Sequence, residues 1–336
     1  MKNLPQLCLL LLAFLPCGAQ TASEEKPIPQ HILANPTDEE IREVIRIQRS
    51  TDLRPSHVRF VDTLALSNGN RLFVLSHHVE GNLHYGAVIL PSGHKRSKLP
   101  IVIFATGGDG IHGDFDITQD FNHKAAQFPN LLGGDLDSST IVVIPSFRGQ
   151  TIIVDGHRYR SEGRLGDAFN GATTDALALL NVVLQNFIEA DEHHISIIGG
   201  SRGGTVALLA ATRDKRIGKV VAVAAPTDML GLYHLYPDQF KLLFFDELMK
   251  GNMSESQARF SFIASSPIYF CEYLPKVQLH HDEGDPFVPL GLARQFEKEM
   301  KQKDMPLTVY IYNEGIHGFW NDPVFWKRVQ KFVTEP

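Results

Sequence analysis

The stretch IIGGSRGGTVALLAAT, residues 197–212, indicates the fold of this chain most strongly. Two apolar residues run directly into four glycines that surround a serine and an arginine, and a helix-forming segment follows. A sharp turn of this kind between a buried strand and a helix projects the side chain of Ser201 away from the backbone. The start of the helix also favours negative charge beside it. The competing interpretation is a glycine-rich packing turn, so the serine needs partners elsewhere in the sequence.

The segments around this turn predict an α/β protein with a mostly parallel sheet and helices on both faces. Near-continuous apolar runs alternate with helical stretches, the pattern of strands that are covered on both sides. Three alternating segments come first and predict an antiparallel meander, and residues 231–266 interrupt the later alternation as a short helical cap insertion. The meander segments are 58–66, 71–79 and 83–91, and the apolar runs are 101–106, 140–145, 195–200, 220–226, 277–281 and 307–312.

Two later loops supply the partners that a nucleophilic serine needs, a base and an acid that orients it. Asp285 follows the next-to-last predicted strand, in HHDEGDPFVP. His317 follows the last predicted strand, between Gly315 and Gly318. Loops at the carboxyl ends of parallel strands meet at one edge of the sheet, and the chain order serine, acid, histidine is the one that a turn of this type predicts. We therefore expect a catalytic triad of Ser201, Asp285 and His317.

These motifs together resemble the catalytic domain of prolyl oligopeptidase-family serine peptidases, a branch of the α/β-hydrolase fold. Family members carry G-x-S-x-G-G, then S-P and a linker, then H-G-x-x-D-x-x-V-P, then a glycine-flanked histidine. This chain carries GGSRGG, SSPIYFCEYLPKVQLHHDEGDPFVP and EGIHGF. The similarity spans residues 85–335 and implies Ser201 as nucleophile, Asp285 as acid and His317 as base.

The resemblance also implies an oxyanion hole, and the chain departs from the family pattern around it. One backbone N–H would come from Arg202, where family peptidases often carry an aromatic residue, and another from Gly108 in the sequence Thr106-Gly107-Gly108. The usual glycine of H-G-x-x-D is Asp282. The segment before the resemblance is too short for the large β-propeller that restricts many family members to peptides, so a peptide substrate and an ester substrate both stay open.

Three further residues are candidates for substrate binding: Arg148, Asp109 and His112. Arg148 lies in PSFRGQ after the second parallel strand and either binds a substrate carbonyl or carboxylate or forms a structural salt bridge. Asp109 and His112 belong to the polar run GGDGIHGDFD. This run and HHDEGD contain oxygen and imidazole groups that suit divalent ions, but neither has a known ligand spacing. We expect no metal and no cofactor, with a metal-dependent hydrolase as a minor alternative.

The first residues predict export. Residues 1–19 contain Lys2, a short apolar run and small residues before a cleavage site after Ala19, which is the pattern of a signal peptide. We expect a periplasmic or secreted protein with a leader and helix at 20–55 and a catalytic domain at 56–336, and no stable membrane span. Two of the 3 cysteines lie in the signal, so the remaining Cys271 is predicted to be a buried structural thiol.

The composition excludes some partners. The chain has a net charge of −6 and its 32 Lys and Arg residues form no long run, which argues against nucleic acid as a partner. The sequence predicts an exported serine hydrolase that forms an acyl-enzyme, with a prolyl oligopeptidase-like peptidase ahead of an acyl esterase. Homo-oligomerisation stays open. A non-catalytic binding protein on a hydrolase fold is the alternative of another class.

Overall fold

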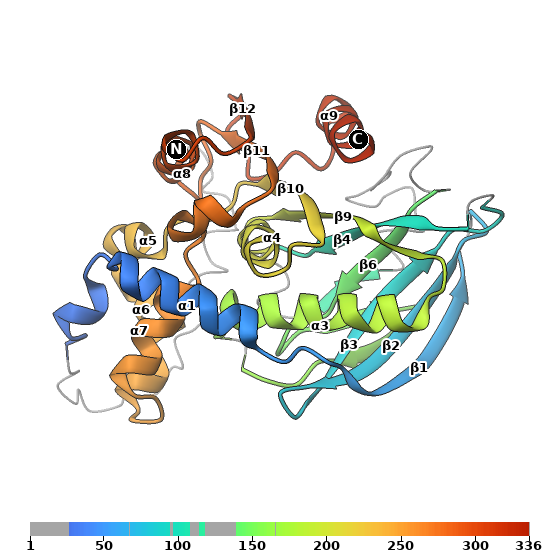
Figure 1. Cartoon of the computed structure of the whole chain (residues 1–336), viewed down its shortest axis with the longest axis horizontal. Coiled ribbons are helices and arrows are strands. Elements are labelled where there is room, and N and C mark those ends of the chain that lie inside the picture. The colour runs from blue at the N-terminus through green and yellow to red at the C-terminus, as the bar shows by residue number, and fades with distance from the viewer. Residues whose placement is uncertain are drawn as a thin grey trace, which may run out of the picture.

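A nine-stranded sheet forms the centre of the computed structural model, which describes residues 27–66, 68–94, 97–107, 114–117, 139–164 and 166–335. The strand order is β1-β2-β3-β6-β4-β9-β10-β11-β12 (Figure 1). The strands are β1 (Ser56–Ala65), β2 (Arg71–Val79), β3 (Asn82–Leu90), β4 (Leu99–Ala105), β6 (Ile141–Pro145), β9 (Ala190–Gly200), β10 (Ile217–Val223), β11 (Lys276–Asp282) and β12 (Leu307–Tyr312).

The pairing confirms a mostly parallel sheet preceded by an antiparallel meander. β1, β2 and β3 pair antiparallel, and β3 is antiparallel to β6. From β6 onward every pair in the sheet is parallel: β6 with β4, β4 with β9, and then β9 to β12 in order. The carboxyl ends of β9, β11 and β12 therefore lie at the same edge of the sheet, and this edge receives the loops that carry the predicted triad.

Helices cover both faces of the sheet, as the sequence predicts. α3 (Asn170–Asn186), α4 (Arg202–Arg213) and α8 (Leu290–Gln302) bury their apolar residues in one core with the strands. α9 (Pro323–Thr334) packs on the opposite face in a second core. Figure 1 shows α8 and α9 on either side of β11 and β12. Among the described residues, no helix is both long and apolar enough to cross a membrane.

A second, three-stranded sheet was not anticipated from the sequence. Its order is β5 (Asp114–Asp116), β7 (Thr151–Val154) and β8 (His157–Arg160). Asp155 and Gly156 connect β7 to β8 with φ values of 48° and 80°. Both values lie in the left-handed region that a tight two-residue hairpin requires, and Asp-Gly is a favoured sequence there.

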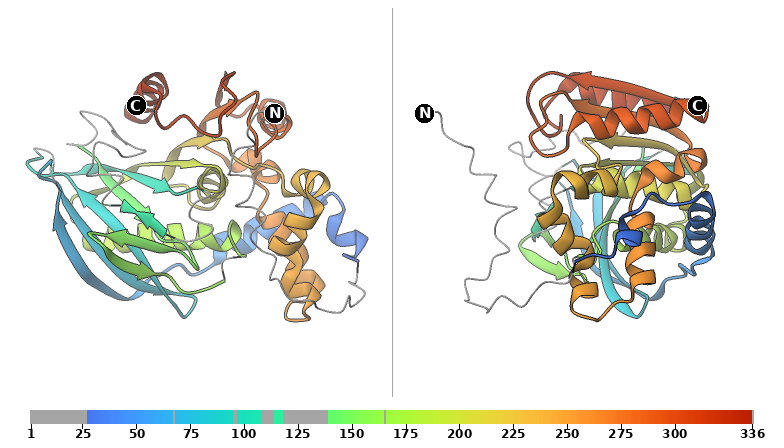
Figure 2. Two further views of the ribbon diagram at one scale, coloured as in Figure 1. Left: turned by 180° about the vertical axis from the view of Figure 1, so that it is seen from behind. Right: turned by 90° about the vertical axis from the view of Figure 1, so that its left-hand side faces the viewer.

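The helical insertion forms a cap together with the N-terminal helix. α5 (Met229–Leu235), α6 (Pro237–Met249) and α7 (Glu255–Ala264) share a third apolar core with α1 (Asp38–Ser50) and the short 3-10 helix η2 (Gln30–Leu33). A second 3-10 helix, η5 (Pro267–Tyr273), leads from the cap back to β11. Figures 1 and 2 show these cap helices and α1 gathered at one end of the molecule.

An ion pair and backbone contacts attach the N-terminal segment to the cap. Arg259 of α7 donates to both carboxylate oxygens of Glu40 in α1, at 2.9 and 3.0 Å. The same guanidinium donates to the carbonyl oxygens of Ile32 and Ala34. The helix that follows the expected leader is thus part of the folded molecule and packs directly against the cap.

Candidate active site

Ser201 lies at a strained turn between β9 and α4. Its φ of 53° and ψ of −123° lie outside the regions that non-glycine residues normally occupy. The turn is held because the Ser201 N–H donates to the Val223 carbonyl of β10 at 2.8 Å. Strain of this kind is retained where the surrounding structure enforces it, and here it displays the Ser201 side chain at the carboxyl edge of the sheet.

The neighbouring glycines are required by space. A Cβ on Gly199 would lie 2.1 Å from the Gly203 oxygen, and one on Gly203 would lie 2.0 Å from the Ala105 oxygen of β4. Neither neighbour is a flexible side chain, so neither position accepts a larger residue without a backbone shift. The glycines two before and two after the serine therefore allow β9, α4 and β4 to approach closely.

One of the two predicted oxyanion donors lies in the described part of the chain. Arg202 is the first residue of α4, where backbone N–H groups have no partner within the helix. The loop after β4 lies against the same turn, because a Cβ on Gly107 would be 2.9 Å from the Gly200 oxygen. The second predicted donor, Gly108, lies outside the described residues.

Asp285 and His317, which the sequence predicts as acid and base, lie within hydrogen-bond distance of each other. His317 Nδ1 lies 2.8 Å from Asp285 Oδ2 and 3.0 Å from Oδ1. The carboxylate is oriented by the backbone N–H groups of Phe287 and Val288, which donate to Oδ1. The Asp285 side chain is fully buried, whereas that of His317 is 20% exposed. A carboxylate at Nδ1 favours the tautomer protonated there, which leaves Nε2 free to accept a proton.

Trp320 links the histidine loop to the serine turn. A Cβ on Gly200 would lie 2.3 Å from Trp320 Cζ2, and one on Gly318 would lie 2.8 Å from Trp320 Nε1. The indole therefore packs against the residue before Ser201 and the residue after His317. Within the described residues, no hydrogen bond joins the Ser201 hydroxyl to His317 itself. Catalytic hydrogen bonds are often long without substrate and shorten in the complex.

The structure places Arg148 in a network of ion pairs. Its guanidinium donates to Asp175 at 2.8 and 3.1 Å, to Asp167 at 2.7 Å and to Glu80 at 3.1 Å. Burial opposes the charge of Arg148, but the three carboxylates outweigh this effect and raise its pKa. The geometry matches the salt-bridge interpretation of Arg148 and leaves this guanidinium few donors for a substrate.

The side chain of Arg202 is a feature that the sequence did not reveal. It is 1% exposed, and its guanidinium carbon lies 4.8 Å from the centre of the Phe147 ring. Its Nε, Nη1 and Nη2 have no hydrogen-bond partner among the described residues. Desolvation lowers the pKa of Arg202 to about 9. The residue that follows Ser201 thus carries a buried charge to which no described carboxylate is hydrogen-bonded.

The remaining candidate residues come from two polar runs, of which only one lies among the described residues. Asp109 and His112 are outside the described residues. The run HHDEGD is described, and both of its histidines are buried. His280 contacts Tyr312 and Gln278, and His281 contacts the Val288 carbonyl. In the described part of the chain, no three His, Cys, Asp or Glu residues are grouped to hold a metal ion. Cys271 is a free buried thiol, as predicted, and burial raises its pKa to about 12.

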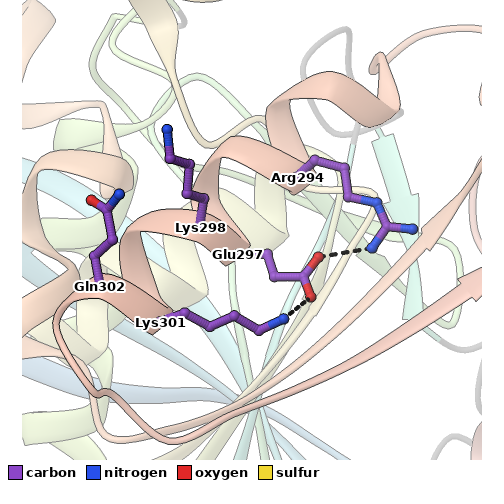
Figure 3. Close-up of a pocket in the computed structure, with 5 residues that line it drawn as sticks. All are labelled: Arg294, Glu297, Lys298, Lys301 and Gln302. Carbon is purple, nitrogen blue, oxygen red and sulfur yellow. Dashed lines mark hydrogen bonds and ion pairs between the residues drawn. The ribbon is translucent and has the colours of Figure 1, made fainter.

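A shallow pocket on α8 contains none of the triad residues (Figure 3). Its lining comes from α8 alone, and Glu297 accepts hydrogen bonds there from Arg294 and Lys301 at 2.8 and 2.7 Å. Ion pairs that are open to solvent contribute little to stability. This pocket is lined by Arg294, Glu297, Lys298, Lys301 and Gln302.

The sheet order, the strained serine turn and the Asp–His pair define an α/β-hydrolase, and the class is that of the serine hydrolases. The family model described as "Prolyl oligopeptidase family" matches residues 135–334. The chain belongs to the prolyl oligopeptidase family. None of the curated proteins matches its sequence.

Solved structures with the same fold include a peptidase and two esterases. An acylaminoacyl peptidase in complex with Z-Gly-Gly-Phe-chloromethyl ketone aligns with a TM-score of 0.58 and 15% identity over 82% of this chain. This chain spans 49% of that peptidase, about half its length. Acetyl xylan esterase from Paenibacillus sp. R4 aligns with a TM-score of 0.64 and 17% identity, over 92% of this chain and 99% of the esterase. Acetyl xylan esterase 1 from Thermoanaerobacterium sp. JW/SL YS485 aligns with a TM-score of 0.62 and 17% identity, over 92% of this chain and 98% of the esterase.

Proposed function

We propose that this chain is a serine hydrolase that acts through an acyl-enzyme formed on Ser201. The hydrogen-bonded Asp285–His317 pair, at the same sheet edge as the strained serine, carries this proposal. His317 Nε2 takes the proton of the Ser201 hydroxyl as Oγ attacks the acyl carbon. Asp285 keeps the imidazole in the required tautomer and stabilises its charged form.

The remaining steps follow from the same groups. The Arg202 N–H donates to the oxyanion that forms, and a donor of this kind is worth ~10²–10³ in turnover. His317 then returns the proton to the leaving amine or alcohol. Water, activated by His317, attacks the acyl carbon and releases the acid, which restores the Ser201 hydroxyl. This sequence needs no cofactor.

A peptide is the first substrate class that we propose, and an acyl ester is the second. The family match supports a peptidase. The ester alternative is supported by the structural similarity to two acetyl xylan esterases, with TM-scores of 0.64 and 0.62. A matched panel of aminoacyl anilides and short acyl esters separates the two. Turnover of esters alone after long incubation would exclude the proposed peptidase activity.

A fluorophosphonate probe tests the nucleophile directly. We expect the intact mass of the wild type to increase by one adduct and that of Ser201→Ala to stay unchanged. Asp285→Asn and His317→Ala should each lower kcat by ~10³-fold or more. A folded wild type that takes no adduct would favour the binding-protein alternative, and loss of turnover in EDTA would favour the metal-dependent one.

We also propose export through residues 1–19, on the sequence pattern alone. The mature protein from the periplasm or medium should begin at Gln20, which its intact mass would show. A protein that keeps Met1 and stays with the cytosolic fraction would contradict export.

A further inference from the structure

Asp282 connects the loop of the acid to the loop of the histidine. It is the last residue of β11, and its side chain is fully buried. Oδ1 accepts the N–H of Gly284 at 2.8 Å and that of Gly315 at 2.9 Å. Oδ2 accepts the N–H of Glu314 at 2.8 Å. One carboxylate thus bonds both loops, which are about thirty residues apart in the chain.

The two loops also touch at their glycines. A Cβ on Gly284 would lie 3.1 Å from Gly315 Cα, so the loop backbones pack against each other at this point. Asp285 is the residue directly after Gly284, and His317 is two residues after Gly315. The contact between the loops therefore lies beside the hydrogen bond that joins Asp285 to His317.

A carboxylate is the side chain that fits this position. Three N–H donors converge on two oxygens, and an ionised aspartate has acceptors only. Burial alone would raise the pKa of Asp282, but the three backbone donors outweigh burial and lower it. Asparagine has the same shape but would direct NH₂ hydrogens at one or two backbone N–H groups. That replacement should move the loops apart while the strand stays in place.

We propose that Asp282 is a positioning residue that sets the Asp285–His317 geometry by bonding the two loops to each other. The inference depends on the proposed function for its kinetic consequence, but the geometry that it explains is present without substrate. Among the described residues, Asp282 has no hydrogen bond to Ser201 or to the His317 imidazole, so its effect passes through the loop backbones that it bonds.

The variant Asp282→Asn tests this role, with Glu283→Gln as the matched control. Glu283 is the exposed neighbour, so its replacement removes the same charge and leaves the three bonds intact. We expect Asp282→Asn to lower kcat by about 10²-fold, as a displacement near 1 Å does, with KM changed less than threefold. Glu283→Gln should keep kcat within about twofold of the wild type.

A proton NMR signal provides the readout that a general loss of stability would not change. The His317 Nδ1 proton, assigned by its absence from His317→Ala, should resonate downfield because it bonds Asp285. We expect the signal to move upfield or disappear in Asp282→Asn below its melting temperature and to remain in Glu283→Gln. An unchanged signal and a kcat within twofold of the wild type in Asp282→Asn would overturn the proposal.

A second pair of variants covers the case in which Asp282→Asn fails to fold. Gly284→Ala places a methyl group against Gly315, whereas Gly291→Ala on α8 points into open space. The first should lower kcat and shift the His317 signal, and the second should do neither. If both variants behave as the wild type, the contact between the loops does not set the Asp285–His317 geometry, and the proposal fails. A wild type without any turnover would refute the proposed function, while the NMR signals would still decide the positioning role.

Discussion

At the scale of single residues, the site depends on close backbone approach more than on side-chain contacts. Ser201 is held at a φ of 53° because a strand, a helix and the loop after β4 meet around it. Glycine permits this close packing, since a Cβ on Gly199 or on Gly203 would overlap a carbonyl oxygen.

Gly203→Ala should therefore destabilise the protein and reduce the reactivity of Ser201. The new methyl group would lie 2.0 Å from the Ala105 oxygen, so the elbow or β4 must move. We expect the free energy of unfolding to fall by about 1–3 kcal/mol, as in overpacked cores, and labelling by the fluorophosphonate to slow. Gly218→Ala is the control, because its Cβ would be 4.0 Å from the nearest oxygen. Equal labelling rates in both variants would contradict the steric account.

Arg202→Met should raise the free energy of unfolding by about 1–3 kcal/mol at pH 7, because buried donors without partners are costly. The buried guanidinium has its pKa lowered to about 9, so the folded state binds its proton less tightly than the unfolded state does. The difference in the free energy of unfolding between the two proteins should therefore shrink above pH 9. Urea unfolding of the wild type and of Arg202→Met at pH 7 and pH 10 measures the two free energies of unfolding and their difference.

Arg213 on the same helix provides the control for this prediction. It is half-buried, and it donates to the carbonyl oxygens of Asn170 and Ala264 and to Asn170 Oδ1. Arg213→Met should lower stability where Arg202→Met raises it. A loss of stability in both variants would mean that Arg202 has a stabilising partner.

At the scale of elements, the sequence predicts what depends on chain order and on local pattern. Apolar runs followed by Asp285 and His317 specify strand ends, and parallel strands place such ends together. The hairpin at Asp155-Gly156 was not predicted, although Asp-Gly favours such a turn, because the strands beside it are only 4 residues long. The bonds of Asp282 were not predicted either, because they join N–H groups whose proximity exists only after folding. The position of the Arg202 guanidinium over Phe147 depends on packing in the same way.

The contact between α1 and α7 gives a prediction at this scale. Arg259 bonds Glu40 and, with the N-cap bonds of Thr37, lowers the pKa of Glu40 to about 2. A carboxylate with a lowered pKa stabilises the fold above its ordinary value of 4.5, and this contribution is lost as the pH falls toward 2. Glu40→Gln should therefore melt below the wild type at pH 7, and the gap should close by about pH 2.

Glu43→Gln on the same helix is the control, with melting temperature against pH as the measurement. Glu43 pairs with Arg46 in solvent, so its removal should change the melting temperature little. A gap for Glu40→Gln that stays constant with pH would show that the ion pair is not its cause.

At the scale of the whole molecule, the cap contacts one loop of a site that the sheet edge carries. The serine turn and the two loops belong to the sheet edge, whereas α5, α6 and α7 form a separate apolar core with the N-terminal segment. The phenyl ring of Phe287, in the acid loop, packs edge-on to His317 at 5.1 Å and belongs to the border of that cap core. The N-terminal segment is thus connected to the site through the cap.

A chain that begins at residue 53 should keep the sheet but lose a firmly packed cap. It would lack Ile32, Val44 and Ile45, which are buried against the cap, and each such side chain contributes roughly 1.5–3 kcal/mol. We expect a lower melting temperature and binding of the dye ANS, which reports exposed apolar surface. A chain that begins at residue 27 is the control and should match the full-length protein. If the chain from residue 53 melts like the control and binds no dye, the N-terminal helix is a separate attachment and the catalytic unit begins after it.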